Sequence, residues 1–218
     1  MGLVLGKITV ETPKYQVVNK TAHYEIRKYE PSIIAEVTYD PKDMKGDPDG
    51  GFMILANYIG ALGNPQNTKP EKIAMTAPVI TQESAEKIAM TAPVITQEAK
   101  PQPESIAMTA PVVTKSDEGK KLVTMQFVLP GSKYSKLEDV PRPTDPRVVI
   151  KQVEDRKYAV VTFSGVANDK VVQEKLLKLK AKLEEDGCKI VGEHLLARYN
   201  PPWTLPPLRT NEIFVPVE

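Results

Sequence analysis

The sequence predicts an α+β protein in which two helices cover one antiparallel sheet system. Both halves of the 218-residue chain show the same succession of two strands, a helix and two further strands. Two stretches at matching places, 26–40 and 150–165, also share an alternation of charged turn and apolar strand. Such pseudo-duplicated β-β-α-β-β units share one core and form one barrel-like domain, because each apolar face must be buried against another element.

The first half opens with three strand patterns, at 15–20, 22–29 and 32–39. They are rich in β-branched and aromatic residues, which favour strands. Residues 40–51 form a turn-rich loop, and its aspartates lack the spacing of a calcium-binding loop. A helix is predicted over 52–62, where apolar residues recur at helical spacing and Gly63-Asn64-Pro65 ends the pattern.

The second half repeats this order. A strong strand at 121–130 closes the first half, and residues 147–165 predict a hairpin of two strands. Residues 169–186 give the clearest helical pattern, with an apolar stripe of Val172, Leu176, Leu179 and Leu183. Strands at 193–200 and 211–217 then flank a proline-rich loop.

One peptide occurs three times between the halves. EKIAMTAPVITQE stands at 71–83 and again at 86–98, and a diverged ESIAMTAPVVT follows at 104–114. The spacing is too short for a solenoid, and the fold needs one strand here. The third copy is favoured, because a short turn joins it to the next strand, whereas the first copy keeps the better distance from the helix. Alternatively, both form strands and the middle copy is looped out. Removing 86–103 is expected to leave folding and ligand affinity nearly unchanged.

Composition and charge narrow the function. A net charge of +1 argues against a general nucleic-acid binder, and no apolar run approaches the length of a membrane span. Cys188 is the single cysteine, which excludes an internal disulfide and fits a reducing compartment. The N-terminus lacks the features of a signal or transit peptide, so a cytoplasmic location is expected.

Known catalytic signatures, such as G-x-S-x-G, H-E-x-x-H or a P-loop, are missing. His23 and His194 each start a strand, and nothing in their spacing supports a metal site. We therefore expect a binding protein, not an enzyme, with no catalytic residue and no resident metal. Helix side chains that the core does not use would form an apolar patch, suited to a flat apolar ligand with acidic groups if Lys or Arg lay at its rim.

Four blocks together resemble the SOUL/haem-binding protein family, and most closely its plant cytosolic members. They are YEIRKYEP (24–31), KIAMTAPV (72–79), MQFVLP (125–130) and ARYNPPWTLPPLRTNEI (197–213). The resemblance covers residues 10–217, so one domain is expected, with a repeat insertion at about 71–114. It implies a distorted antiparallel β-barrel with two helices.

The resemblance also implies binding of haem and other tetrapyrroles, such as protoporphyrin, in a shallow apolar groove beside the first helix. By position, the contacting residues would be Phe52, Met53, Leu55, Ala56 and Ile59. Arg209 is the candidate partner of a propionate; alternatively, it pairs with Glu212 or a loop carbonyl.

Some animal members of the family carry an axial histidine where this chain has Lys28. A lysine is protonated near neutral pH and is a poor iron ligand unless buried. The implied mode is therefore apolar contact plus propionate pairing, which tolerates metal-free porphyrin. The leading hypothesis is a monomeric, non-catalytic carrier or buffer of tetrapyrroles in the cytosol. The alternative is a protein-interaction module using the same groove, since some animal members are linked to mitochondrial cell-death partners.

Overall fold

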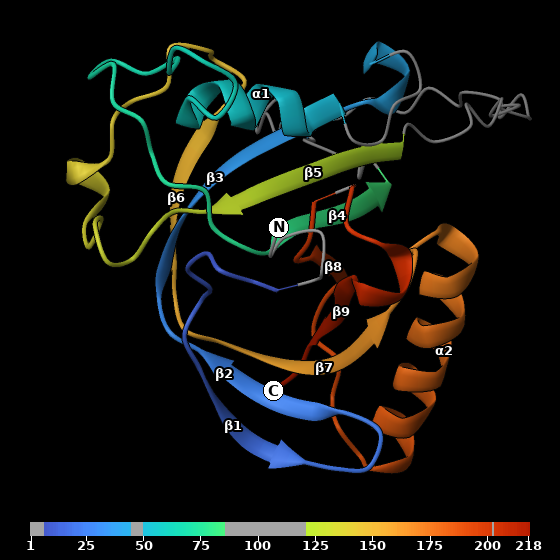
Figure 1. The fold of residues 1–218 in the computed structure, drawn as a ribbon. Coiled ribbons are helices and arrows are strands. Elements are labelled where there is room, and N and C mark those ends of the chain that lie inside the picture. The colour runs from blue at the N-terminus through green and yellow to red at the C-terminus, as the bar shows by residue number, and fades with distance from the viewer. Residues whose placement is uncertain (1–6, 45–49, 86–120, 202) are drawn as a thin grey trace, which may run out of the picture.

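The computed structural model describes residues 7–44, 50–85, 121–201 and 203–218. Within them the chain forms two α-helices, nine strands and three short 3-10 helices (Figure 1). The helices are α1 (Gly50–Ile59) and α2 (Asp169–Glu185). The strands are β1 (Tyr15–Lys20), β2 (Glu25–Tyr29), β3 (Ser32–Tyr39), β4 (Val79–Ala85), β5 (Lys121–Val128), β6 (Val149–Val153), β7 (Arg156–Ser164), β8 (Leu195–Arg198) and β9 (Thr210–Pro216).

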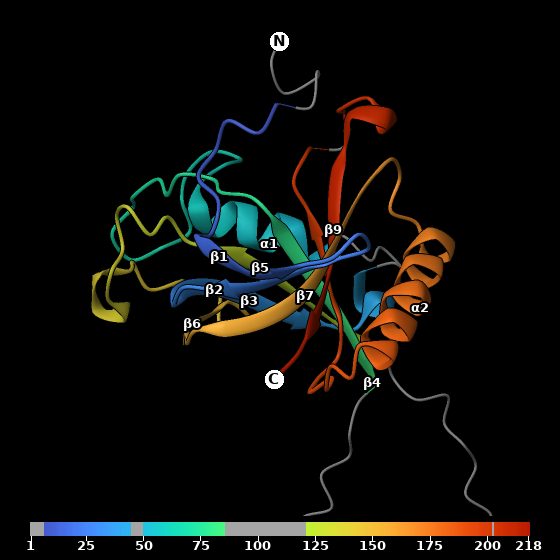
Figure 2. The ribbon, with the colours of Figure 1, turned by 90° about the horizontal axis from the view of Figure 1, so that it is seen from below.

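All nine strands belong to one antiparallel sheet, in the order β1-β2-β7-β9-β8-β4-β5-β3-β6. The sheet curls, with α1 over the strands of the first half and α2 beside those of the second (Figures 1 and 2). The predicted α+β architecture of duplicated units is confirmed. The two halves exchange their first strands, because β2 pairs with β7 and β6 pairs with β3.

Helix α1 packs tightly on the first half of the sheet. It begins two residues before the predicted start, at a pair of glycines. A Cβ on Gly51 would lie 2.4 Å from the Tyr39 ring, so only glycine allows this approach of helix and strand. Leu55, Tyr58 and Ile59 are fully buried, against the alternate residues of β3 and β5.

Helix α2 covers the second half and lies where its periodicity predicts. The Asn168 side chain accepts a hydrogen bond from Val171 N (3.0 Å) and caps the helix. The buried stripe is the predicted one, Val172, Leu176, Leu179 and Leu183, and it packs on β7, β8 and β9. Neither helix in the described part of the chain is long and apolar enough to cross a membrane.

The sheet face turned away from both helices, here called the inner face, has its own core. Three rings, Tyr29, Tyr158 and Phe214, lie within 5.5–5.8 Å of one another, centroid to centroid. Aliphatic side chains from both halves surround them, namely Ile34, Ile80, Val128, Val160, Leu195 and Ala197. This cluster joins the two duplicated units into one body.

The first copy of the repeated peptide supplies β4. It pairs with β5 on one side and with β8 on the other. The preference for the third copy as partner of the 121–130 strand was therefore wrong, since β3 and the first copy occupy both sides of β5. Residues 86–120, which hold the second and third copies, lie outside the described residues.

Candidate functional site

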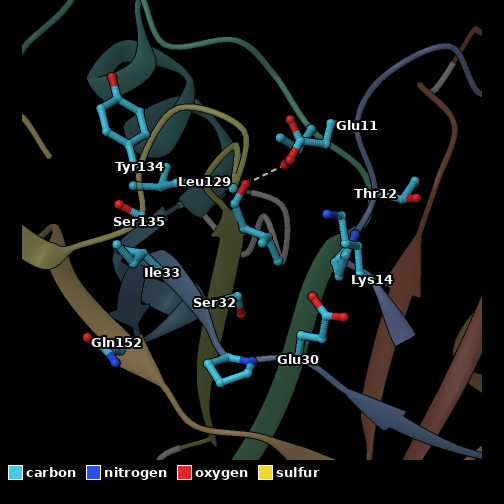
Figure 3. Close-up of a pocket in the computed structure, with 15 residues that line it drawn as sticks. Glu11, Thr12, Lys14, Glu30, Ser32, Ile33, Leu129, Tyr134, Ser135 and Gln152 are labelled. Carbon is cyan, nitrogen blue, oxygen red and sulfur yellow. Dashed lines mark hydrogen bonds between the residues drawn. The ribbon is translucent and has the colours of Figure 1, made fainter. Parts of the chain in front are cut away.

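A cleft of about 280 Å³ opens where the N-terminal segment crosses the sheet (Figure 3). Its walls come from five places far apart in the sequence: the segment before β1, the β2–β3 turn, the middle of the first repeat copy just before β4, the chain around and after the end of β5, and strand β6. Ile33, Val128 and Leu129 supply apolar surface, and hydroxyl and amide groups, including Ser32, Ser135 and Gln152, line its sides.

Glu11 fixes one wall of the cleft. Its carboxylate accepts hydrogen bonds from Ser132 N (3.1 Å) and Ser132 Oγ (2.6 Å), and its backbone oxygen accepts one from Ala77 N (3.0 Å). The hydrogen bond from the Ser132 hydroxyl is the main reason why the pKa of Glu11 lies below its usual value. The N-terminal segment is thus tied to both the repeat and the loop after β5.

The cleft carries one cation among its lining residues, Lys14, next to Glu30 (Figure 3). The two segments are joined by a hydrogen bond from Glu30 N to Lys14 O (3.1 Å). A pocket of 280 Å³ lies just under the range of about 300–1,000 Å³ that encloses small ligands. A large flat ring would therefore be only partly enclosed, with its acidic edge within reach of solvent and of Lys14.

The predicted helix residues lie in two different environments. Leu55, Ala56 and Ile59 are 0–2% exposed and belong to the core. Phe52 is half-buried, with its ring 5.5 Å from that of Phe127, and Met53 is 54% exposed. Contact of these five residues with a ligand stays a prediction. Met53 and Phe52 are the two with surface to offer while the core stays closed.

Arg209 lies just after a short 3-10 helix, η3 (Pro206–Leu208), in the β8–β9 loop. Its Nε–H donates to Thr204 O at 2.8 Å, so the loop carbonyl foreseen as an alternative partner is present. Glu212, the other alternative, is engaged by different residues. The role of Arg209 toward a propionate stays a prediction.

Glu212 is the centre of a buried network that the sequence did not reveal. Arg27 Nη1 donates to its Oε1 at 2.9 Å, and both side chains are 7% exposed. Thr162 Oγ1 (2.9 Å) and Tyr199 Oη (2.5 Å) also donate to this carboxylate. Burial and the nearby Glu212 charge raise the pKa of Tyr199. Arg27 and Glu212 stand in two of the blocks that carry the family resemblance, and here they join β2 to β9.

Comparisons with known proteins match nearly the whole chain. The family model described as SOUL heme-binding protein matches residues 10–85 and 97–216. The chain belongs to the SOUL haem-binding protein family. It is 27% identical to human Heme-binding protein 2 over 212 residues, covering 94% of this chain and 85% of the human protein. Mouse Heme-binding protein 2 is 26% identical, covering 88% of this chain and 77% of the mouse protein.

Two solved structures share the fold at low identity. The C-terminal domain of EcmrR matches with a TM-score of 0.52 and 12% identity, covering 94% of this chain and 98% of that one. An uncharacterised conserved protein from Listeria innocua matches with a TM-score of 0.50 and 13% identity, covering 94% and 92%. At such identities the likeness shows the fold alone.

Membership of the SOUL family supports haem as the bound ligand, and the side chains present bear on how it would be held. Lys28 is half-exposed and pairs with Asp155 (2.7 Å), whose pKa its hydrogen bond lowers. None of the described residues that line the cleft is His, Cys or Met. Across the described residues, no three His, Cys, Asp or Glu side chains gather as a metal site would require. The cleft thus offers an apolar floor and the cation of Lys14 beside it.

Proposed function

We propose that this protein binds haem and other tetrapyrroles without chemical turnover and serves as their carrier or buffer. The observation that carries the proposal is the SOUL family match across nearly the whole chain, together with relatives named for haem binding. As the sequence predicts, we place it in the cytosol as a monomer of the plant cytosolic type. Residues 10–217 would act as one domain, consistent with their single sheet.

The ring would lie on apolar surface beside α1, where Phe52 and Met53 reach the outside. Burying a methionine side chain contributes about 1.5–3 kcal/mol, so Met53 is a fair anchor for a flat ligand. The cleft of Lys14 is the second place to test, because it offers a cation beside an apolar floor. No axial bond to iron is part of this proposal.

A titration with haemin and with protoporphyrin IX tests the proposal, followed by Soret absorbance and by emission of Trp203. Trp203 is the only tryptophan in the chain and is 67% exposed. Both ligands should bind with similar affinity. Tight haemin binding without any protoporphyrin binding would show axial ligation, and no saturable change with either would refute tetrapyrrole binding.

Three variants locate the site. Met53→Glu should weaken binding at least about 10-fold, since the lost apolar contact exceeds about 1.4 kcal/mol. Leu177→Glu is the matched control, because Leu177 is 66% exposed on the outer face of α2. Ser135→Trp fills the cleft; if it blocks binding while Met53→Glu does not, the ligand lies in the cleft instead of beside α1.

The alternative of a protein-interaction module has one observation in its favour. The β8–β9 loop exposes three large apolar side chains within six residues, Trp203, Leu205 and Leu208, at 67%, 51% and 41%. Exposed apolar patches often mark contact surfaces. Failure of both porphyrins to bind would favour a protein-interaction module over tetrapyrrole binding.

A further inference from the structure

The β8–β9 loop carries an apolar tip, defined here as residues 203–208. Trp203, Leu205 and Leu208 are 67%, 51% and 41% exposed. The two prolines between the leucines are exposed as well. Figure 2 shows this loop in red, standing out beyond the body of the sheet. The tip is therefore a convex apolar projection and not the wall of a groove.

A second loop adds apolar surface at the base of the tip. Asn211 Nδ2 donates to Gly165 O at 3.0 Å, which holds the β7–α2 loop against the start of β9. Val166 follows directly and is 49% exposed. Neither 203–208 nor 165–168 contains a charged residue. This end of the molecule thus presents uncharged side chains from two loops.

The backbone around the tip satisfies its own hydrogen bonds. Three N–H groups donate to carbonyl oxygens of the same loop, namely Thr204 to Pro201 (3.0 Å), Leu208 to Leu205 (2.8 Å) and Arg209 to Pro206 (3.1 Å). The two prolines of the tip have no N–H that needs an acceptor. Arg209 Nε also donates to Thr204 O at 2.8 Å. Backbone that leaves water for a lipid phase must keep its hydrogen bonds within the protein, so this loop is suited to that transfer.

The side chains of the tip favour a lipid bilayer over a protein as the partner. A protein interface carries about one hydrogen bond per 100–200 Å², so it needs polar groups on both sides. Within 203–208 the only exposed side-chain donor is the indole N–H of Trp203, because Thr204 is 1% exposed. Tryptophan is enriched at the boundary of headgroups and acyl chains, where the ring leaves water and the N–H still reaches it.

We propose that this protein docks on lipid bilayers as a peripheral protein, by inserting Trp203, Leu205 and Leu208 between the headgroups. The attraction is apolar, because the tip is uncharged, and it requires no anionic lipid. Docking is reversible, since three side chains bury far less apolar surface than a spanning helix does. It is independent of tetrapyrrole binding and is a property of the ligand-free protein.

Trp203 makes the test direct, because it is the single tryptophan of the chain. Ligand-free protein is mixed with phosphatidylcholine vesicles, and with vesicles whose acyl chains carry bromine. The emission of Trp203 should move to shorter wavelength as lipid is added, bromine should quench it, and the protein should float with the vesicles. Raising the salt from about 0.15 M to about 1 M should leave the partition nearly unchanged, since salt screens charges and not apolar contacts.

Two leucine pairs locate the contact while Trp203 stays in place as the probe. Leu205→Ser/Leu208→Ser should weaken the partition at least about 10-fold, because two apolar side chains no longer gain from leaving water. Leu137→Ser/Leu177→Ser is the matched control, with leucines that are 44% and 66% exposed on the loop after β5 and on α2. It should bind vesicles as the unaltered protein does. All four leucines are exposed, so both variants should keep the fold, which circular dichroism checks.

Three results would overturn the proposal. The first is an emission of Trp203 that stays unshifted and unquenched at every lipid concentration. The second is vesicle binding that both leucine pairs leave unchanged, since the contact then lies elsewhere on the protein. The third is self-association that Leu205→Ser/Leu208→Ser abolishes, without any binding to vesicles, which would assign the tip to a protein contact.

Discussion

The two halves of the sheet each place an acid and a base on the inner face, yet in different surroundings. In the second half, Arg27 and Glu212 are each 7% exposed. In the first half, Lys151 pairs with Glu36, and the lysine side chain is 51% exposed. In both pairs the cation lies on an exchanged strand, Arg27 on β2 and Lys151 on β6. The carboxylate also accepts a hydrogen bond from the residue directly opposite on the next strand, which is Thr162 for Glu212 and Gln126 for Glu36.

The difference shows how duplicated positions diverge in energy while keeping their geometry. A buried pair is stable only while both partners and their hydrogen bonds are present, since either charge alone would be stranded away from water. In the other pair only the cation reaches water, since the Glu36 side chain is 12% exposed; loss of that lysine costs less, because water replaces it. The second half is therefore the more rigidly specified, and the first, which carries the candidate ligand surfaces, tolerates change on this face.

Removal of Glu212 tests the buried pair, for which we expect the larger loss of stability. Glu212→Ala leaves Arg27 with Glu25 and the Tyr29 hydroxyl and deprives Thr162 and Tyr199 of their acceptor. We expect a loss of about 3–5 kcal/mol in the free energy of unfolding, measured by urea titration. The double variant Arg27→Met/Glu212→Leu should lose less than the single one, because no charge is left unpaired. An equal or greater loss in the double variant would show that packing, not charge, dominates the site.

The same network should make the stability of the protein depend on pH, through the carboxyl group of Glu25. Hydrogen bonds from Lys20 and then Arg27 hold the pKa of Glu25 below its ordinary value of 4.5. A depressed carboxyl pKa contributes stability that is present above the unfolded-state value and is lost as the pH falls through the folded-state value. Stability should therefore fall below about pH 4.5, and Glu25→Gln should flatten that slope. Glu25→Asp keeps a titrating carboxyl and should retain part of it; identical slopes in all three proteins would exclude Glu25 as a source.

Lys151→Ala is expected to have the smallest effect, less than about 1 kcal/mol. Circular dichroism during thermal unfolding measures it well enough, and Gln126 continues to hold Glu36 through its 2.8 Å hydrogen bond. A loss comparable to that of Glu212→Ala would erase the distinction between the two halves.

Much of the fold could be predicted from sequence, since its elements have strong local patterns. The strands at 15–20 and 32–39 lie where β-branched residues place them, and α2 follows its apolar stripe. For α1 the pattern could not separate core from surface. Apolar residues surround this helix, and loops as well as the sheet bury it, so Leu55 and Met53 look alike in sequence but differ completely in exposure.

The candidate site was less accessible to sequence reasoning, because it is assembled from distant segments. Glu11 and Ser132 meet only in the folded chain, and neither belongs to a recognisable motif. Three copies of one peptide likewise cannot be ranked by pattern. The structure places the first at β4, with Ile73 N bonded to Ile59 O at the end of α1.

The exchanged strands β2 and β6 also set an order of events during synthesis. β2 needs β7 beside it, and that strand begins about 130 residues later in the chain. At about 5–20 residues per second, a ribosome takes roughly 6–25 s to supply it. Through that interval two strand pairings of the first half cannot form: β3 lacks β6, and β2 lacks β7. The first half of the sheet therefore cannot be completed until most of the chain has been made.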